Sequence, residues 1–233
     1  MYYGFIPLIA AMIFAMLASA RVRSTFQAYS QVRSMRGITG AQAARMVLDA
    51  NGLNNIPIEK VQGNLTDNYD PRTRTLHLSQ SVCDVPSVSA IAVACHEAGH
   101  AIQHDKGYIP LHIRNRIVPI ASVASSFSWI LVIGGILLVQ MGTAQYGAIG
   151  ETLFNIGVYA FMAVVAFHLV TLPVEFNASN RAMQSMETLG ISAGEELRGV
   201  KKVLSSAALT YIAALAVSIA NLLRVLAIRG NRR

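Results

Sequence analysis

The stretch SVSAIAVACHEAGHAIQ, residues 87–103, decides the fold of the polar part of this chain. Small apolar residues recur in it at helical spacing, so it predicts one helix. His96 and His100 stand four residues apart, which places both imidazoles on one helix face, within reach of one metal ion. Glu97 points elsewhere but can reach a water molecule on that metal. This pattern is typical of a zinc site with two histidine ligands and a glutamate as general base.

The residues around this helix predict a small α+β unit. Asp84 or Ser87 can cap the start of the helix, and Gly107 can end it after about Lys106. The other expected elements are a helix at residues 39–50 capped by Thr39, strands at 58–61 and 74–78, and a turn at 67–71.

A catalytic zinc ion needs a third protein ligand and an open position for water. Lys106 stands ten residues after His96, so a third histidine of the metzincin type is absent. His104 continues the same helix face but lies about 12 Å along the axis from His96, too far to share the ion. We expect it to cap the helix or to support a ligand. Glu175, which closes the third hydrophobic segment, is a better candidate than His104 for the third ligand. Its other possible role, an interfacial carboxylate at a membrane end, stays equally open at this point.

The composition indicates a membrane protein. Of the 233 residues, 53% are hydrophobic and 13% are charged, whereas soluble proteins carry about 25% charged residues. This excludes a disordered chain, a coiled coil and an ordinary cytosolic enzyme. Two cysteines exclude a disulfide framework. The net charge of +7 indicates membrane orientation and contact with anionic lipid, and nucleic acid is not expected as a partner.

Four uncharged segments are long enough to cross a bilayer as helices, which takes about 20 residues. They are residues 1–20, 117–140, 152–174 and 203–223. No basic residue precedes the first segment and Arg21 follows it directly, so we expect an uncleaved anchor rather than a signal peptide. Pairs of small residues, Gly134-Gly135 and Ala213-Ala214, permit a homo-oligomer or a complex with other membrane proteins.

The distribution of Lys and Arg predicts the orientation in the membrane. The blocks 21–116 and 175–202 carry eleven and four of them, which is 15 of 19. Both blocks should therefore face the cytoplasm, with the N-terminus outside. Four arginines after residue 223 conflict with this rule if the last segment crosses. That segment is therefore transmembrane or interfacial, and crossing is favoured.

Together these features predict a mostly helical α+β integral membrane protein, with about four transmembrane helices and a small zincin-like cytoplasmic domain. The expected parts are an anchor at 1–20, a cytoplasmic zinc-protease domain at 21–116, a transmembrane hairpin at 117–174, a cytoplasmic helix with the third ligand at 175–202, and a fourth hydrophobic segment at 203–228.

Four stretches together resemble the YugP-like membrane zinc metallopeptidases. They are residues 87–103 quoted above, LPVEFNASNRA at 172–182, YDPRTRTLHLS at 69–79 and VRSTFQAYS at 22–30. The similarity covers nearly the whole chain. It implies a bacterial multi-pass gluzincin of the inner (plasma) membrane, in which an α+β cytoplasmic zinc domain is interrupted by a helical hairpin.

The resemblance also implies roles for single residues. His96, His100 and Glu175 would bind one Zn²⁺ per chain, and Glu97 would be the catalytic base. The segment from Glu175 onward is also similar to the ligand helix of HtpX-type proteases. An aspartate usually stands there at the position of Ser179, so Ser179, Asn177 and Asn180 are the candidates for supporting a ligand.

The expected function is that of a zinc-dependent endopeptidase acting on cytosolic or membrane-adjacent protein segments. Residues 74–78 are either an internal strand or an edge strand that binds extended substrate through Leu76, His77 and Leu78. The alternative function is a membrane adaptor that keeps a zinc site and presents substrates to another membrane protease. The intact Glu97 favours the enzyme, because a structural zinc site needs no general base.

Overall fold

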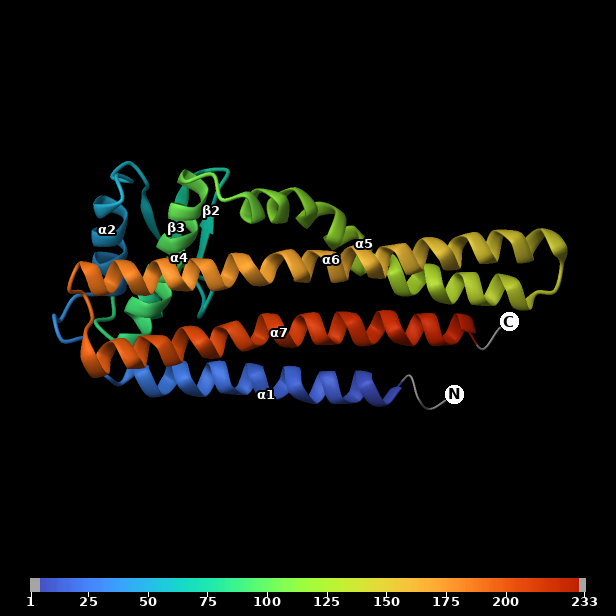
Figure 1. Ribbon diagram of the computed structural model, residues 1–233, viewed down its shortest axis with the longest axis horizontal. Helices are drawn as coiled ribbons and strands as arrows, with labels where there is room; N and C mark the ends of the chain where they lie inside the picture. The colour runs from blue at the N-terminus through green and yellow to red at the C-terminus, as the bar shows by residue number, and fades with distance from the viewer. Residues whose placement is uncertain (1–4, 231–233) are drawn as a thin grey trace. The chain divides into compact units, whose positions relative to one another are not determined.

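The computed structural model describes residues 5–230, and most of these are helical (Figure 1). The helices are α1 (Phe5–Ser30), α2 (Gly40–Ala50), α3 (Gln80–Cys83), α4 (Val88–Asp105), α5 (Ile109–Gln140), α6 (Ala144–Thr188) and α7 (Gly194–Gly230). The strands are β1 (Ile58–Val61), β2 (Asn68–Asp70) and β3 (Thr75–Ser79).

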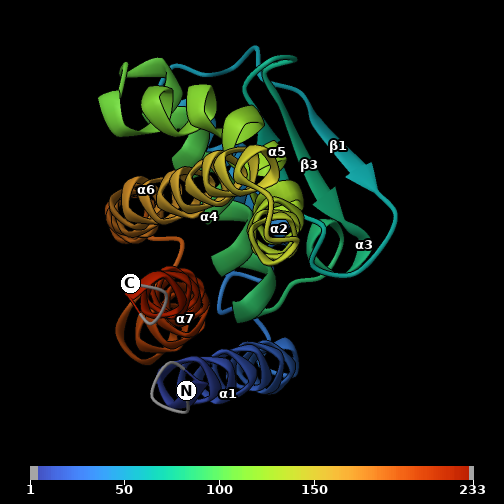
Figure 2. The ribbon, with the colours of Figure 1, turned by 90° about the vertical axis from the view of Figure 1, so that its right-hand side faces the viewer.

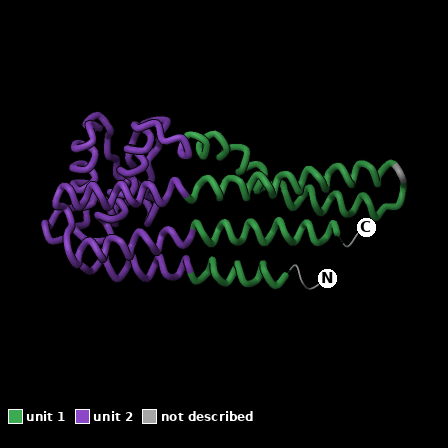
Figure 3. The backbone as a smooth tube through the Cα atoms, in the orientation of Figure 1, with its two compact units in different colours: residues 1–17, 112–172, 211–233 green, residues 18–111, 173–210 purple. Residues whose placement is uncertain are grey.

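The described chain divides into two compact units, coloured separately in Figure 3. The first unit comprises residues 5–17, 112–172 and 211–230, and the second comprises 18–111 and 173–210. The first contains helix segments alone, whereas the second contains the sheet and α4. All the residues that the sequence predicts to bind or support a metal lie in the second unit.

Helices α1, α5, α6 and α7 are each long and apolar enough to cross a membrane. The prediction of four such helices is therefore confirmed. Each helix is longer than its uncharged segment, because polar residues at one or both ends continue the same helix. The two outer predicted segments thus become helices of 26 and 37 residues.

The predicted boundaries at 174/175 and 202/203 fall inside α6 and α7. Helix α6 continues through Pro173 to Thr188, although a proline inside a helix removes one backbone hydrogen bond and its ring crowds the preceding turn. A turn then separates it from α7, which begins at Gly194. The segment 175–202 is therefore the end of one helix, a turn and the start of another.

The α+β unit forms largely where the sequence predicts it. Thr39 caps α2 through a capping box, in which Gln42 N–H donates to Thr39 Oγ1 and Thr39 N–H donates to Gln42 Oε1. Ser87 caps α4 by accepting a hydrogen bond from Ala90 N–H. Asp84, the other candidate cap, instead pairs with Lys60.

The three strands form one mixed sheet in the order β1-β3-β2. β1 runs parallel to β3, beside which it lies in Figure 2, and β2 runs antiparallel to β3. The prediction of a turn at 67–71 was wrong for Asn68–Asp70, which form β2. Tyr69 lies opposite Leu76 in this ladder, and burial of the Tyr69 ring stabilises the extended backbone.

β3 is the central strand of this sheet, so the edge-strand interpretation of Leu76, His77 and Leu78 was wrong. β1 and β2 occupy its two edges and leave none for a substrate strand to join. Leu76 and Leu78 are fully buried in the core, and His77 faces the opposite side, near Glu59. The alternation of apolar residues in β3 is typical of a half-buried strand, whether it lies at the centre or at the edge of a sheet. The sequence alone therefore does not distinguish these two positions.

The core of the second unit packs around α4. Its largest fully buried side chains come from α2, β3, α4 and α6, and they include Leu48, Leu78, Ile91 and Met186. Cys95 is also completely buried among them. The core therefore fixes the α4 face that carries the two histidines relative to the end of α6.

In the first unit, α5 and α6 approach closely at Gly135 and Gly150. A Cβ atom on Gly135 would lie 2.6 Å from the backbone oxygen of Gly150, so this glycine packs within the chain. Ala213 is likewise buried. Formation of an oligomer through Gly134-Gly135 and Ala213-Ala214 stays a prediction.

Candidate metal centre

Gly99 allows α4 and α6 to approach closely beside the two histidines. A Cβ atom on Gly99 would lie 2.5 Å from the carbonyl oxygen of Ala178 on α6. No side chain fits in that space, so the two backbones meet there directly. Ala178 lies between Glu175 and Ser179 on α6. The close approach therefore brings these two side chains to the His96–His100 face of α4.

The side chains of His96, His100 and Glu175 converge at this approach. Nε2 of His96 lies 3.2 Å from Glu175 Oε2, and Nε2 of His100 lies 3.5 Å from the same oxygen. The two imidazole rings meet edge to face, with their centroids 4.8 Å apart. One donor atom from each of the three residues lies within 4.8 Å of the others. The three donors can therefore bind one metal ion together.

A chain of hydrogen bonds fixes the imidazole of His100. The amide nitrogen of Gln103 donates to Val174 O at 2.8 Å and to Asn177 Oδ1 at 3.0 Å. The amide oxygen of Gln103 therefore faces His100 Nδ1, 2.9 Å away, and accepts a hydrogen bond from it. A proton on Nδ1 leaves a lone pair on Nε2, the nitrogen that faces Glu175.

Arg181 fixes the far end of this chain. Its Nε donates to Asn177 Oδ1 at 2.7 Å, and a guanidinium group is never an acceptor. Asn177 therefore presents its oxygen toward both Arg181 and Gln103. This sets the direction of every hydrogen bond back to the ring of His100, and with it the tautomer that can bind a metal.

Ser179 supports the other histidine. Its hydroxyl lies 3.1 Å from His96 Nδ1, so a hydrogen bond joins the outward nitrogen of this ring to α6. Both histidines thus have Nδ1 hydrogen-bonded to a neighbour and Nε2 directed at Glu175. This arrangement is typical of metal-ligating histidines, whose second ring nitrogen is held by a hydrogen-bond partner.

Glu175 is almost completely buried, with an exposed fraction of 2%. Burial alone would raise the pKa of its carboxyl group. The hydrogen bonds and positive charge of His100 and His96 outweigh burial, and the pKa lies well below its usual range. The side chain therefore remains a carboxylate, the form that binds a cation.

Glu97 lies beside these three residues but outside the group of ligands. Its Oε2 accepts a hydrogen bond from Tyr69 N–H of β2 at 3.1 Å. Burial raises its pKa to about 7, the negative charges of Glu175 and Asp67 also raise it, and His96 and the Tyr69 N–H lower it. A carboxyl group with a pKa near neutrality can both accept and return a proton.

The remaining predicted site residues lie in different surroundings. Nδ1 of His104 is 2.9 Å from the hydroxyl of Tyr69, so His104 supports β2. Asn180 is exposed and has no side-chain hydrogen bond within the described chain, so its predicted support of a ligand was wrong. Asn177 reaches His100 only through Gln103, a residue that the sequence reasoning missed. The signal for Gln103 was its position three residues after His100 on the same helix.

These residues fit a zinc ion. Two imidazole nitrogens and one carboxylate are the donor set of catalytic zinc sites, which keep a further position for water. Glu175 is ionised, and the hydrogen bond from His100 Nδ1 to Gln103 leaves Nε2 of His100 as the nitrogen that can bind the metal. The described structure thus provides a candidate His₂Glu site for a metal ion, with a carboxyl group beside it.

Comparison with known proteins agrees with this chemistry. Residues 4–230 match the model of the family described as "Putative neutral zinc metallopeptidase". The chain is 45% identical over 225 residues to "Putative membrane protease YugP" of Bacillus subtilis (strain 168), covering 97% of this chain and 96% of that protein. No solved structure matches the chain. This chain therefore belongs to the zinc metallopeptidase family that the model describes.

Proposed function

We propose that the chain is a membrane-embedded, zinc-dependent endopeptidase that hydrolyses peptide bonds in cytosolic or membrane-adjacent protein segments. The observation that carries this proposal is the convergence of His96 Nε2, His100 Nε2 and Glu175 Oε2, with Glu97 beside them. The name of the relative, "Putative membrane protease YugP", supports the same function.

Glu97 is the proton carrier in this mechanism. A zinc ion held by His96, His100 and Glu175 would supply a polarised water molecule and a Lewis acid for the substrate carbonyl. Glu97 accepts a proton as the water attacks the carbonyl carbon, and then returns it to the amine that leaves. The hydrogen bond from Tyr69 N–H to Oε2 of Glu97 holds this carboxyl group in place.

The substrate would bind along β2 rather than β3. β2 is an outer strand of the sheet, and its Tyr69 N–H contacts Glu97 directly. Because Tyr69 N–H is bound to Glu97, an extended segment beside this edge would lie next to the proton carrier without pairing to that N–H. β1 is the other outer strand, and β3 separates it from β2.

We also propose that the metal centre faces the cytoplasm. The blocks 21–116 and 175–202 carry 15 of the 19 Lys and Arg residues, and all of both blocks except residues 112–116 belongs to the second unit. The positive-inside rule places such blocks on the cytoplasmic side. A cysteine in place of the exposed Lys106, in a Cys83→Ser chain, should react with an impermeant maleimide only after the cells are permeabilised. Labelling of intact cells would place the centre outside.

The substitution Glu97→Gln tests the enzymatic proposal. The amide that replaces the carboxylate cannot accept a proton, so casein cleavage by the detergent-purified chain should fall by at least about 100-fold while bound zinc is unchanged. Glu187→Gln, an exposed position on α6, is the matched control and should keep both. Full activity of Glu97→Gln would overturn this mechanism. Zinc without cleavage in the wild type would favour the adaptor function instead.

A further inference from the structure

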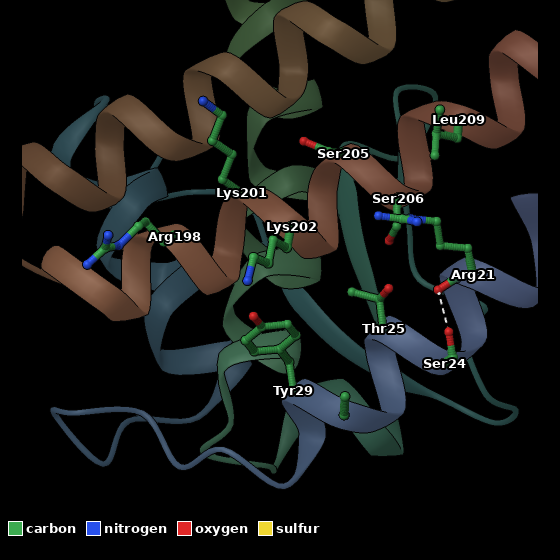
Figure 4. Close-up of a pocket in the computed structure, with 11 residues that line it drawn as sticks. Arg21, Ser24, Thr25, Tyr29, Arg198, Lys201, Lys202, Ser205, Ser206 and Leu209 are labelled. Atoms are coloured by element: carbon green, nitrogen blue, oxygen red, sulfur yellow. Dashed lines mark hydrogen bonds between the residues drawn. The ribbon is translucent and has the colours of Figure 1, made fainter.

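A second candidate site lies between α1 and α7, within the second unit and apart from the metal centre. It is a groove of about 880 Å³. The α1 side is lined by residues that recur at helical spacing, Arg21, Ser24, Thr25, Ala28 and Tyr29, and the α7 side by Arg198, Lys201, Lys202, Ser205, Ser206 and Leu209 (Figure 4). Two helix faces therefore form this groove, and we call it the α1–α7 groove.

The α1–α7 groove is positively charged. It is lined by four basic residues and by no Asp or Glu. Arg198 pairs with Glu195, outside the groove. Among residues 5–230, Arg21, Lys201 and Lys202 have no ion-pair partner. Positive charges gathered in one groove repel one another, and an anion bound between them would remove that repulsion.

Two of the basic side chains extend from one helix toward the other across the groove. In Figure 4, Arg21 extends from α1 toward Ser206 of α7, and Lys202 extends from α7 toward Tyr29 of α1. Lys201 and Arg198 point away from α1. The two inner cations thus come from different helices that line the same groove.

Hydroxyl groups complete the lining. Ser24 and Ser206 donate to backbone oxygens of their own helices, those of Arg21 and Val203. In the described part of the chain, Thr25 and Tyr29 have no side-chain hydrogen bond. Their hydroxyls are therefore available to the oxygens of an anion. Phosphate oxygens accept hydrogen bonds from such hydroxyls as well as from Arg and Lys.

The groove lies where the apolar segment of α1 ends and the apolar segment of α7 begins. Arg21 is the first charged residue after twenty uncharged ones, and Lys202 is the last before the uncharged run 203–223. In a membrane helix this position is at the level of the lipid headgroups. Leu209 lines the apolar side of the groove, next to the place where acyl chains would begin. A lipid fits this combination of charge and position better than a soluble anion does.

We propose that the α1–α7 groove binds the phosphate headgroup of an anionic membrane lipid. Arg21 and Lys202 bind the phosphate oxygens, and the hydroxyls of Thr25 and Tyr29 donate to them. Basic pockets between membrane helices on the cytoplasmic side are suited to such headgroups. The proposal rests on the placement of these helices in a membrane, and it does not depend on peptidase activity.

The test compares lipid binding by the full-length, detergent-purified chain and by Arg21→Gln/Lys202→Gln. Soluble short-chain phosphatidylglycerol is titrated, and its affinity is taken from the rise in melting temperature. Each basic residue near an anionic lipid strengthens binding about fivefold, so the double variant should bind about thirtyfold more weakly. Arg23→Gln/Arg72→Gln removes the same charge from exposed positions outside the groove and should bind like the wild type.

Two further probes identify the source of the phosphate. Short-chain phosphatidylcholine and inorganic phosphate should each raise the melting temperature of the wild type less than phosphatidylglycerol does. An equal rise with inorganic phosphate would replace the lipid by a soluble anion and overturn the proposal. Equal phosphatidylglycerol affinity of the double variant and the wild type would also overturn it. If the double variant does not fold, Arg21→Lys should retain binding and Arg21→Gln should weaken it about fivefold.

Discussion

At the scale of single residues, the amide of Gln103 decides how His100 can act. Its nitrogen is engaged by Val174 O and Asn177 Oδ1, so only its oxygen can face the ring. In its neutral form, His100 therefore carries its proton on Nδ1 and its lone pair on Nε2. The histidine spacing in the sequence predicts two ligands on one helix face, but the hydrogen bonds set the tautomer in which His100 can bind a metal.

Replacement of Gln103 by Leu should weaken zinc binding. The His100 ring would lose the acceptor that fixes its orientation and tautomer, and loss of such a partner lowers metal affinity by about 10- to 100-fold. Competition with a fluorescent zinc chelator measures this change. Gln184→Leu, at an exposed position on α6, should leave the affinity unchanged. Equal zinc affinity of Gln103→Leu and wild type would show that the amide does not orient the ligand.

Glu196 predicts a dependence of stability on pH. Burial raises the pKa of its carboxyl group, and the hydrogen bond from Met35 N–H lowers it less. A carboxyl group with a higher pKa in the folded state costs stability as the pH rises above its unfolded value of about 4.3. The melting temperature of Glu196→Gln, measured relative to wild type, should therefore rise as the pH is increased from about 4, near the unfolded pKa, to about 8. A constant difference over this range would contradict the shifted pKa.

At the scale of secondary structure, the sequence predicts α2, α4 and β1 with nearly the observed bounds, because their caps and apolar patterns are local. Thr39 and Ser87 begin their helices as expected. β2 is different. Its residues are typical of a turn, and it becomes a strand only through pairing with β3 and burial of Tyr69. Long-range pairing also decides that β3 is central, and nothing in its own sequence contains that information.

The approach of α4 to α6 depends on Gly99. A methyl group there would meet the Ala178 carbonyl at 2.5 Å, so the helices would have to separate beside the ligands. Gly99→Ala should lower the free energy of unfolding by about 1–3 kcal/mol. It should also weaken zinc binding, because Glu175 and Ser179 would move away from the histidines. Thermal melting and zinc titration of the purified variant measure the two effects.

Gly134→Ala is the matched control for this substitution. Gly134 also lies within a helix, and a Cβ atom there would meet nothing within 4 Å. Helix propensity alone then favours alanine by up to about 1 kcal/mol. If Gly99→Ala were as stable as Gly134→Ala and bound zinc as tightly as wild type, the close approach would not be what positions the centre.

At the scale of the whole molecule, the proposed metal links parts of the chain that are far apart in sequence. His96 and Glu175 are separated by 79 positions, and the intervening residues include all of α5 and most of α6. The hydrophobic segments predict that the chain leaves and returns to the α+β unit. The meeting of Glu175 with α4 follows from the family resemblance and from packing at Gly99, and composition alone does not predict it.

Removal of zinc should therefore destabilise the second unit as a whole. A ligand present at about 100 times its dissociation constant stabilises the folded state by about 2.7 kcal/mol. Treatment with a chelator should lower the melting temperature, and added zinc should restore it, whereas magnesium should not, since it prefers oxygen ligands. Glu175→Ala should melt at the same temperature with and without chelator. A wild-type melting temperature that stays constant while zinc is lost would exclude a stabilising metal.

The most direct test of the His₂Glu centre is the zinc content of purified wild type and Glu175→Ala, measured together with casein cleavage. Glu187→Ala serves as the matched control, since Glu187 is exposed on the same helix. We predict about one zinc ion per chain and cleavage for wild type and Glu187→Ala, and loss of both for Glu175→Ala. If Glu175→Ala keeps its zinc and its activity, the third ligand is a different residue and the proposed centre is wrong.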